Sequence, residues 1–275
     1  MRRTAIFALG LFALGCQPSI ERRLEEAREL IFQQRTEEAI AAYRSLLYAL
    51  ESQPGKEAEC ARIEALSRIG DLTYLEKRDV RGAAETYRAL IDLAPQSEEA
   101  YWAREKLAEI AHRHLKDYPE AISHWQALAG SGRPDADRFA YLVAKAYFEL
   151  RDFEQSRQEC ETVARKFPDS KAAQDALFLL ATSHQFEGNH EKAIAAFDRV
   201  EELWPGTEIA TRARFQKGRA RFASGDPDGA LADYLEALKT HPDPERVQAE
   251  IARARRHLAE LERIRRGGPR AAFQG

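Results

Sequence analysis

Apolar and small residues recur along this chain at helical spacing, and one arrangement of them returns six times. A small residue is followed by a large side chain four positions later and by an apolar residue three positions after that. The small residues are Ala39, Ala83, Ala121, Ser156, Ala193 and Ala230. Residues four apart share one face of a helix, so each copy predicts a helix that a neighbouring helix can approach closely.

The spacing of the copies indicates a repeated structural unit. They follow one another at intervals of 44, 38, 35, 37 and 37 residues. The residues in the second place are Tyr43, Tyr87, Trp125, Cys160, Phe197 and Tyr234, of which all but Cys160 are aromatic. Cys160 replaces an aromatic ring in the fourth copy, and we expect it to be a buried thiol that forms no disulfide with Cys60.

Proline and aspartate mark the ends of the predicted helices. Proline ends a helix because it lacks an N–H and clashes with the preceding turn; the prolines that follow the copies are Pro95, Pro168, Pro205 and Pro242. Asp226 before Pro227 and Asp243 before Pro244 are typical of helix starts. No segment alternates with the period of a strand, so the expected fold is all-α.

The predicted helices form six pairs and one further helix. Their expected bounds are about 20–33 and 36–52, 57–77 and 80–93, 97–115 and 119–129, 135–150 and 153–167, 170–187 and 190–203, 207–223 and 227–240, and finally 244–266. Residues 16–243 are then the repeats, residues 244–266 a capping helix, and residues 267–275 a disordered tail.

One repeat carries most of a known motif. Residues 177–205 hold Leu177, Leu180, Ala181, His184, Ala193, Phe197 and Pro205 in the places of the pattern W-x2-L-G-x2-Y, A-x3-F and P. The stretch resembles a tetratricopeptide repeat. The resemblance implies a right-handed α-solenoid of about six helix pairs, with the first helix of each pair lining a concave groove.

The last predicted helix has the pattern of a cap. Its apolar residues lie on one face and are Val247, Ile251, Ala254, Leu258 and Leu261. Its arginines are Arg253, Arg255, Arg256, Arg263, Arg265 and Arg266. They are expected to form a solvated face that keeps the end of the repeats soluble; the alternative is contact with acidic lipid or a partner.

The first residues have the pattern of an export signal. Arg2 and Arg3 precede an apolar run over residues 4–14, and Gly15 and Cys16 follow. This run is too short to cross a bilayer, which needs about 20 residues. We therefore expect residues 1–15 to be a signal peptide that is removed.

Gly15 and Cys16 resemble the cleavage box of bacterial lipoproteins, in which the cysteine is lipidated. Ala13 stands where that box usually has leucine, and Ala13 with Gly15 would also suit ordinary signal peptidase. The preferred hypothesis is lipidation of Cys16 and attachment to the periplasmic face of the outer membrane. The alternative is a soluble periplasmic protein.

The turns between repeats resemble those of bacterial envelope proteins. Phe167, Pro168, Asp169 and Ser170 match an F/Y-P-x-S pattern before an alanine-rich helix pair. Outer-membrane and periplasmic tetratricopeptide proteins share it, including the helical lipoprotein of the β-barrel assembly machinery and the Tol–Pal-associated protein. The resemblance implies a non-enzymatic scaffold that binds another envelope protein or peptide. A cytosolic adaptor and a non-catalytic subunit of an envelope enzyme are the alternatives.

Charge and motifs indicate no other class of function. The net charge is −3, and it becomes −5 without residues 1–15, so nucleic acid is not an expected partner. The nucleotide-binding, metalloprotease and hydrolase motifs are missing, and neither a cofactor nor a small-molecule substrate is expected. His112 and His114 lie two apart on a helix and do not face each other, so no metal site is expected there.

The candidate binding residues lie beside the apolar stripes of three first helices. Cations interleaved with aromatic rings can hold an extended peptide through cation–π contacts and pairing with carboxylates. These residues are Arg138, Tyr141, Lys145 and Phe148, then Phe178, Gln185 and Phe186, and then Arg212, Phe215, Arg219 and Phe222.

Overall fold

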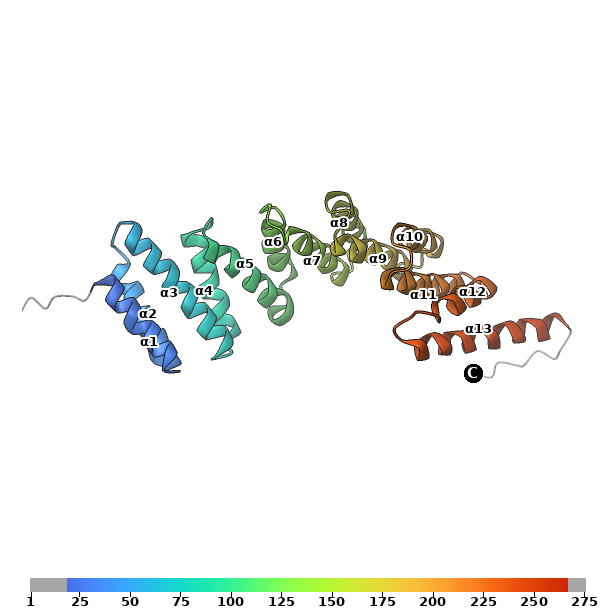
Figure 1. The fold of residues 1–275 in the computed structure, drawn as a ribbon, viewed down its shortest axis with the longest axis horizontal. Helices are drawn as coiled ribbons and strands as arrows, with labels where there is room; N and C mark the ends of the chain where they lie inside the picture. The colour runs from blue at the N-terminus through green and yellow to red at the C-terminus, as the bar shows by residue number, and fades with distance from the viewer. Residues whose placement is uncertain (1–18, 267–275) are drawn as a thin grey trace, which may run out of the picture. The chain divides into compact units, whose positions relative to one another are not determined.

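The computed structural model describes residues 19–266, and within this range every regular element is a helix. The elements are α1 (Ile20–Phe32), α2 (Thr36–Leu50), α3 (Lys56–Leu75), α4 (Val80–Leu93), α5 (Glu98–Ile110), the π-helix η1 (Ala111–Leu115), α6 (Tyr118–Ala129), α7 (Ala136–Glu149), α8 (Phe153–Lys166), α9 (Lys171–Phe186), α10 (His190–Leu203), α11 (Glu208–Ala223), α12 (Pro227–Ala237) and α13 (Pro244–Arg265) (Figure 1). This confirms the predicted all-α fold of six helix pairs and a final helix. The predicted signal peptide, Cys16 and the predicted tail at 267–275 lie outside the described residues.

The chain forms two compact units, and their boundary falls inside α5, between Lys106 and Leu107. In the first unit, α1 packs on α2, α2 on α3 and α3 on α4, while α1 also touches α3. The core of this unit joins α1, α2 and α3, and Tyr43 of the repeated arrangement is fully buried in it. Each helix therefore covers the apolar stripe of its neighbours in the chain.

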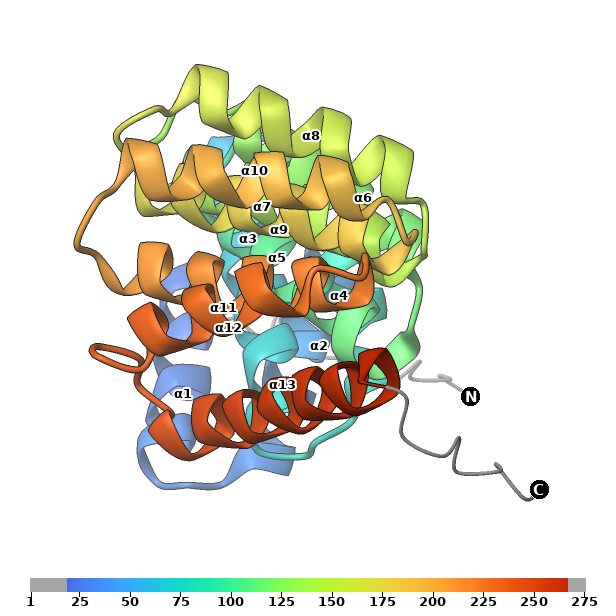
Figure 2. The same ribbon diagram turned by 90° about the vertical axis from the view of Figure 1, so that its right-hand side faces the viewer.

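In the second unit the same packing continues through α12 and α13. Each helix from α6 to α13 contacts the next one along the chain. In addition α7 touches α9 and α9 touches α11, so these three first helices form one layer. The final helix α13 lies beside α12, as Figures 1 and 2 both show.

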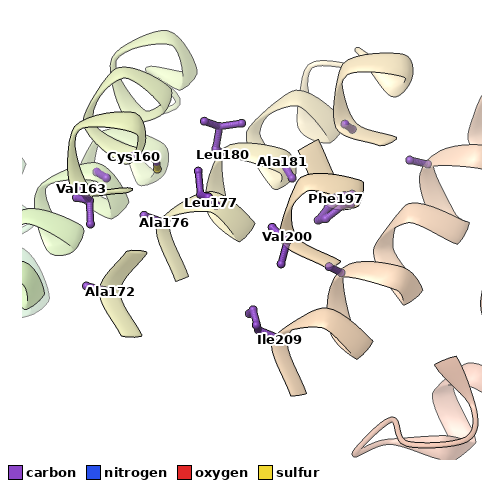
Figure 3. Close-up of a cluster of buried hydrophobic side chains, with 14 residues drawn as sticks. Cys160, Val163, Ala172, Ala176, Leu177, Leu180, Ala181, Phe197, Val200 and Ile209 are labelled. Carbon is purple, nitrogen blue, oxygen red and sulfur yellow. The ribbon is translucent and has the colours of Figure 1, made fainter. Parts of the chain in front are cut away.

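The core of the second unit is built from the repeated arrangement. Ala193, Phe197 and Val200 of α10 are fully buried, and Leu177 and Leu180 of α9 pack against them (Figure 3). Cys160 lies in the same cluster and is fully buried. The expected buried thiol is confirmed, and both Cys60 and Cys160 are free.

Glycine lets paired helices touch at two places. A Cβ added to Gly218 of α11 would lie 2.7 Å from the Cε1 atom of Tyr234 on α12. A Cβ added to Gly70 of α3 would lie 2.6 Å from the same atom of Tyr87 on α4. Both tyrosines occupy the large-residue place of the arrangement, so each ring packs directly on the backbone of the partner helix.

Most predicted helix starts are confirmed. The Asp226 carboxylate accepts a hydrogen bond from the Gly229 N–H at 2.8 Å, and Pro227 lies in the first turn of α12. Asp243 caps α13 in the same way by accepting from the Arg246 N–H at 3.0 Å. These caps satisfy N–H groups that have no partner inside the helix.

Several helix ends differ from the prediction by two residues or more, among them those of α2, α3, α5 and α12. The helix predicted over 97–115 leaves the α-helical form at Ile110 and continues as the π turn η1, after which Lys116 has φ +57°. Helices α2 and α12 end at Leu50 and Ala237 rather than near 52 and 240. Just beyond the ends of α2 and α12, backbone N–H groups donate hydrogen bonds to the carbonyl three residues earlier instead of four. These shorter hydrogen bonds tighten the last turn, and the α-helix stops there.

The final helix buries only its first half. Val247, Ile251 and Ala254 are buried against α12 and its neighbours, whereas Leu261 is 39% exposed. None of the helices among residues 19–266 combines the length and the apolar character that a membrane crossing requires.

Candidate functional site

The predicted binding residues lie on α7, α9 and α11 of the second unit. We call the surface that these three neighbouring helices share the first-helix face. It brings together residues that repeats of about 36 positions separate in the sequence. Three groups of side chains lie on it, and a cavity forms part of the third.

The first group joins all three helices. The Arg212 guanidinium of α11 lies 4.9 Å from the centroid of the Phe178 ring of α9. That ring packs edge-on against Phe197 at 5.6 Å, which holds it in place. An exposed cation on a partly buried ring is a platform that can accept a partner's carboxylate on one side and its apolar groups on the other.

Tyr141 and Asp175 complete this group. Burial, together with the nearby Asp175 carboxylate, raises the pKa of the Tyr141 phenol to about 12. Burial also raises the pKa of Asp175, while Lys171 and Arg212 act in the opposite direction. Asp175 was missed from the sequence because a single acid on a helix gives no signal until the neighbouring helices are in place.

The second group is an aromatic cluster at the ends of α7 and α9. The Phe148 ring lies 5.3 Å from the centroids of both Phe153 and Phe186. Phe186 is nevertheless 64% exposed. Phe153 is the first residue of α8 and was not predicted; an aromatic ring at a helix start beside a predicted groove is the signal that marks it. Lys145 lies nearby, with its Nζ 3.8 Å from the Glu149 Oε1.

The third group lines a cavity of about 340 Å³ where the end of α11 meets α13. Its lining residues are Gln185, His190, Arg219, Phe222, Ala223, Tyr234, Glu250 and Arg253. The Arg253 guanidinium lies 4.9 Å from the centroid of Phe222, whose ring also packs on His257 at 5.4 Å. The final helix thus contributes Glu250 and Arg253 to the site. From the sequence, Arg253 was expected on a solvated face with contact to a partner as the alternative, and Glu250 was not identified.

Phe215 does not belong to this face. It is only 2% exposed and packs against Tyr234 and His241, with the Arg246 guanidinium 5.5 Å from its ring centroid. This corrects the prediction that Phe215 lines the groove. Phe215 lies beside the apolar stripe of α11, as predicted. However, the turn before α13 and α13 itself cover its ring, and the periodicity of the sequence does not show which other helix covers a residue.

The histidines near η1 have structural partners. The His112 Nε2 lies 2.7 Å from the Glu149 Oε2, and its ring packs against Tyr118 and Trp125. Among residues 19–266 no group of three His, Cys, Asp or Glu side chains is placed to hold a metal ion.

The sequence matches one family. The model of the tetratricopeptide repeat family matches residues 72–136, 110–171, 144–208, 178–245 and 215–272, which together span more than half of the chain. The last match includes α13, so this helix occupies the place of a further first helix. No curated protein sequence matches the chain.

Several solved structures share the fold. The C-terminal part of a repeat-containing protein from Cytophaga hutchinsonii has a TM-score of 0.57 and 18% identity, covering 88% of this chain and 89% of its own. The apo form of RapI has a TM-score of 0.55 and 12% identity, covering 90% and 75%. Naa15/Naa10 bound to HypK-THB has a TM-score of 0.61 and 18% identity, covering 86% and 34%. At these identities the likeness concerns the fold alone.

Proposed function

Because the chain belongs to the tetratricopeptide repeat family, we propose that it is a non-enzymatic scaffold that binds an extended segment of a partner protein along the first-helix face. Repeats of this family serve as protein–protein interaction scaffolds. The observation that carries the proposal is the row of exposed arginines and rings on neighbouring helices, above all Arg212 on Phe178.

The aromatic cluster supports this proposal because it offers a place where binding energy can concentrate. Interface energy is dominated by a few large side chains that become fully buried on binding. Phe186 is more than half exposed, yet two further rings hold it in place, so it loses little conformational freedom when a partner covers it.

The arginines add direction and specificity. Arg138 of α7 and Arg212 and Arg219 of α11 are exposed on first helices that lie on either side of α9. Positive groups at this spacing favour a partner segment with acidic residues, and they raise its association rate more than its affinity.

We also propose that the protein works in the bacterial cell envelope, attached through a lipid on Cys16. The support is the order of the basic pair, the apolar run and the Gly15–Cys16 junction at the amino terminus. One acyl chain gives only marginal membrane binding, whereas the several chains of a lipoprotein cysteine anchor stably. A soluble periplasmic protein is the alternative outcome.

Site-specific crosslinking tests the binding face. A photoreactive phenylalanine analogue at Phe186 is expected to capture a discrete partner in cells, while the same analogue at Leu203 of α10, which is 51% exposed, captures none. Arg138→Glu with Arg212→Glu should lower the yield from Phe186 by about tenfold, because two favourable charge interactions become repulsive. Equal capture from both positions, or an unchanged yield in the double variant, contradicts the proposed face.

Fractionation tests the anchor. Cys16→Ser is expected to move the protein from the membrane pellet to the soluble fraction, because serine cannot receive the lipid. Mass spectrometry of the mature amino terminus serves as the control for cleavage. A soluble wild-type protein cleaved before Cys16 would show that the residue marks ordinary signal-peptidase cleavage, and a retained segment 1–15 would contradict export.

A further inference from the structure

The cavity at the junction of α9, α11 and α13 combines two cations with an apolar wall. We infer that it receives a carboxylate side chain of the bound partner segment, held between Arg219 and Arg253. This inference rests on the proposed function and adds the chemistry of one contact. The cavity lies on the first-helix face, because Gln185 of α9 and Arg219 of α11 both line it.

The position of Arg253 is fixed before any ligand binds. Its guanidinium packs over the Phe222 ring at 4.9 Å, and Phe222 itself contacts α13 through His257. A guanidinium on an aromatic face keeps its N–H groups free at the edges for an acceptor. An acid that enters the cavity therefore meets a positioned donor and loses less entropy than it would beside a mobile arginine.

Glu250, the acidic residue in the cavity wall, does not accept a hydrogen bond from the Arg253 guanidinium. The Glu250 Oε2 lies 3.6 Å from the Arg253 Nη1, which is an ion-pair contact too long for a hydrogen bond. Arg219 directs one Nη1 donor to the Gln216 side chain at 3.2 Å. Each guanidinium carries five N–H donors, so both retain capacity for a second carboxylate.

The electrostatics of the cavity agree with this assignment. Burial raises the pKa of the Tyr234 phenol and Glu250 raises it further, while Arg219 and Arg253 act in the opposite direction. Both guanidinium groups are thus close enough to influence the hydroxyl of a residue in the cavity wall. The two arginines and one glutamate of the lining together carry a net charge of +1.

The size and the remaining walls of the cavity can accommodate a carboxylate side chain. The volume of about 340 Å³ lies at the low end of the range for ligand pockets, roughly 300–1,000 Å³. Phe222 and Ala223 offer an apolar surface to a side-chain stem, and Gln185 offers an amide. The His190 Nδ1 is buried and has no hydrogen-bond partner among the described residues, so that nitrogen is not committed to the fold.

Binding of two model peptides tests the inference. The probes are fluorescein-labelled hexaglutamate and hexaglutamine, both with blocked ends, measured by fluorescence anisotropy on the chain from Gln17 to its end. We expect hexaglutamate to bind and hexaglutamine to bind at least about tenfold more weakly. Arg219→Gln and Arg253→Gln should each weaken hexaglutamate by about tenfold, whereas Arg256→Gln, on the exposed surface of the same helix, changes it less than about twofold.

Other outcomes overturn the inference. An equal loss of affinity for hexaglutamate in all three variants would show that the peptide is attracted to the arginine-rich surface in general and not to this cavity. Equal binding of both peptides would show a groove without a carboxylate contact and would leave the proposed function standing. Failure of hexaglutamate to bind, or its displacement by inorganic phosphate more readily than by acetate, rejects the carboxylate assignment. Unchanged circular dichroism of the variants excludes misfolding, and crosslinking at Phe186 reports on the proposed function independently of all these results.

Discussion

At the scale of single residues, side-chain size at the repeated positions decides how closely the helices pack. Tyr234 and Tyr87 lie on the backbone of glycines in the partner helix. In the fourth repeat Cys160 of α8 fills the place of the ring, and Ser156 of the same helix donates its hydroxyl to the Ala144 carbonyl of α7 at 2.9 Å. Different residues can therefore close the contact between paired helices, by ring packing on a glycine or by a smaller side chain with a hydrogen bond.

The contact at Gly218 gives a test at this scale. Gly218→Ala is expected to lower the free energy of unfolding by about 1–3 kcal/mol, because the added Cβ would meet the Tyr234 ring. Helix propensity alone predicts the opposite, a gain of up to about 1 kcal/mol. Urea denaturation followed by circular dichroism distinguishes the two. As a control, Ala223→Gly at the exposed end of the same helix should cost no more than about 1 kcal/mol.

At the scale of elements, α11 has two different tasks. One side presents Arg212 and Arg219 to the first-helix face, and another side buries Lys217 between α10 and α12. The Lys217 Nζ lies 2.7 Å from carboxylate oxygens of both Asp198 and Glu201, and 3.6 Å from Asp233. Because a buried ammonium group is costly without partners, this network fixes the pairing of α11 with both neighbours.

Removing the central cation tests the network. Lys217→Met should lower the free energy of unfolding at pH 7 by up to about 3 kcal/mol, because it removes the buried cation between these carboxylates and leaves Glu201 and Asp233 with only Arg214 and Arg221 as partners. Lys239→Met removes only the exposed pair with Glu236 and should change stability by less than about 1 kcal/mol. Chemical denaturation of both variants gives the comparison, and equal effects would show that burial of the Lys217 network has no energetic consequence.

The same network predicts how the difference in stability between the wild type and Lys217→Met depends on pH. Burial opposes the charge of Lys217, but hydrogen bonds to Asp198 and Glu201 outweigh it, so the pKa is raised above 10.5. A folded-state pKa above the unfolded one stabilises the protein below the unfolded pKa, and this contribution is lost as the pH rises through the folded pKa. The gap between wild type and Lys217→Met should therefore be constant near neutral pH and shrink above about pH 10.5.

At the scale of the whole molecule, stability is expected to be local. Within each of the two units the contacts between helices fall mainly between neighbours in sequence. Proteins built in this way have stabilities that sum over repeats and nearest-neighbour interfaces. A destabilising substitution in one repeat should therefore lower the stability of that repeat and its neighbours and leave distant repeats unchanged.

Hydrogen exchange can test this locality. Tyr87→Ala removes a ring that is 2% exposed, and we expect amide exchange in α3 and α4 to accelerate by about tenfold or more. Exchange in α11 and α12 should not change. Tyr48→Ala, which alters a side chain that is 82% exposed, is the matched control. A uniform acceleration in every helix would show instead that the chain unfolds as one cooperative unit.

The sequence predicted which helices carry most of the site's residues. It did not predict which of these residues lie together in one group. Helical spacing identified Arg212, Phe178 and Phe186 as neighbours of the apolar stripe. It did not identify Asp175, Phe153 or Arg253, because their importance depends on which side chains of other helices lie opposite them.

The sequence by itself determined the helix pairs, their caps and the buried face of each helix. These features depend on interactions within about four residues and on a period that repeats along the chain. The tertiary structure alone decided that Phe215 is buried, that Lys217 is surrounded by carboxylates, and that α13 forms one wall of the cavity beside Arg219. The reason is physical: periodicity shows which face a helix buries, but packing decides what lies against it.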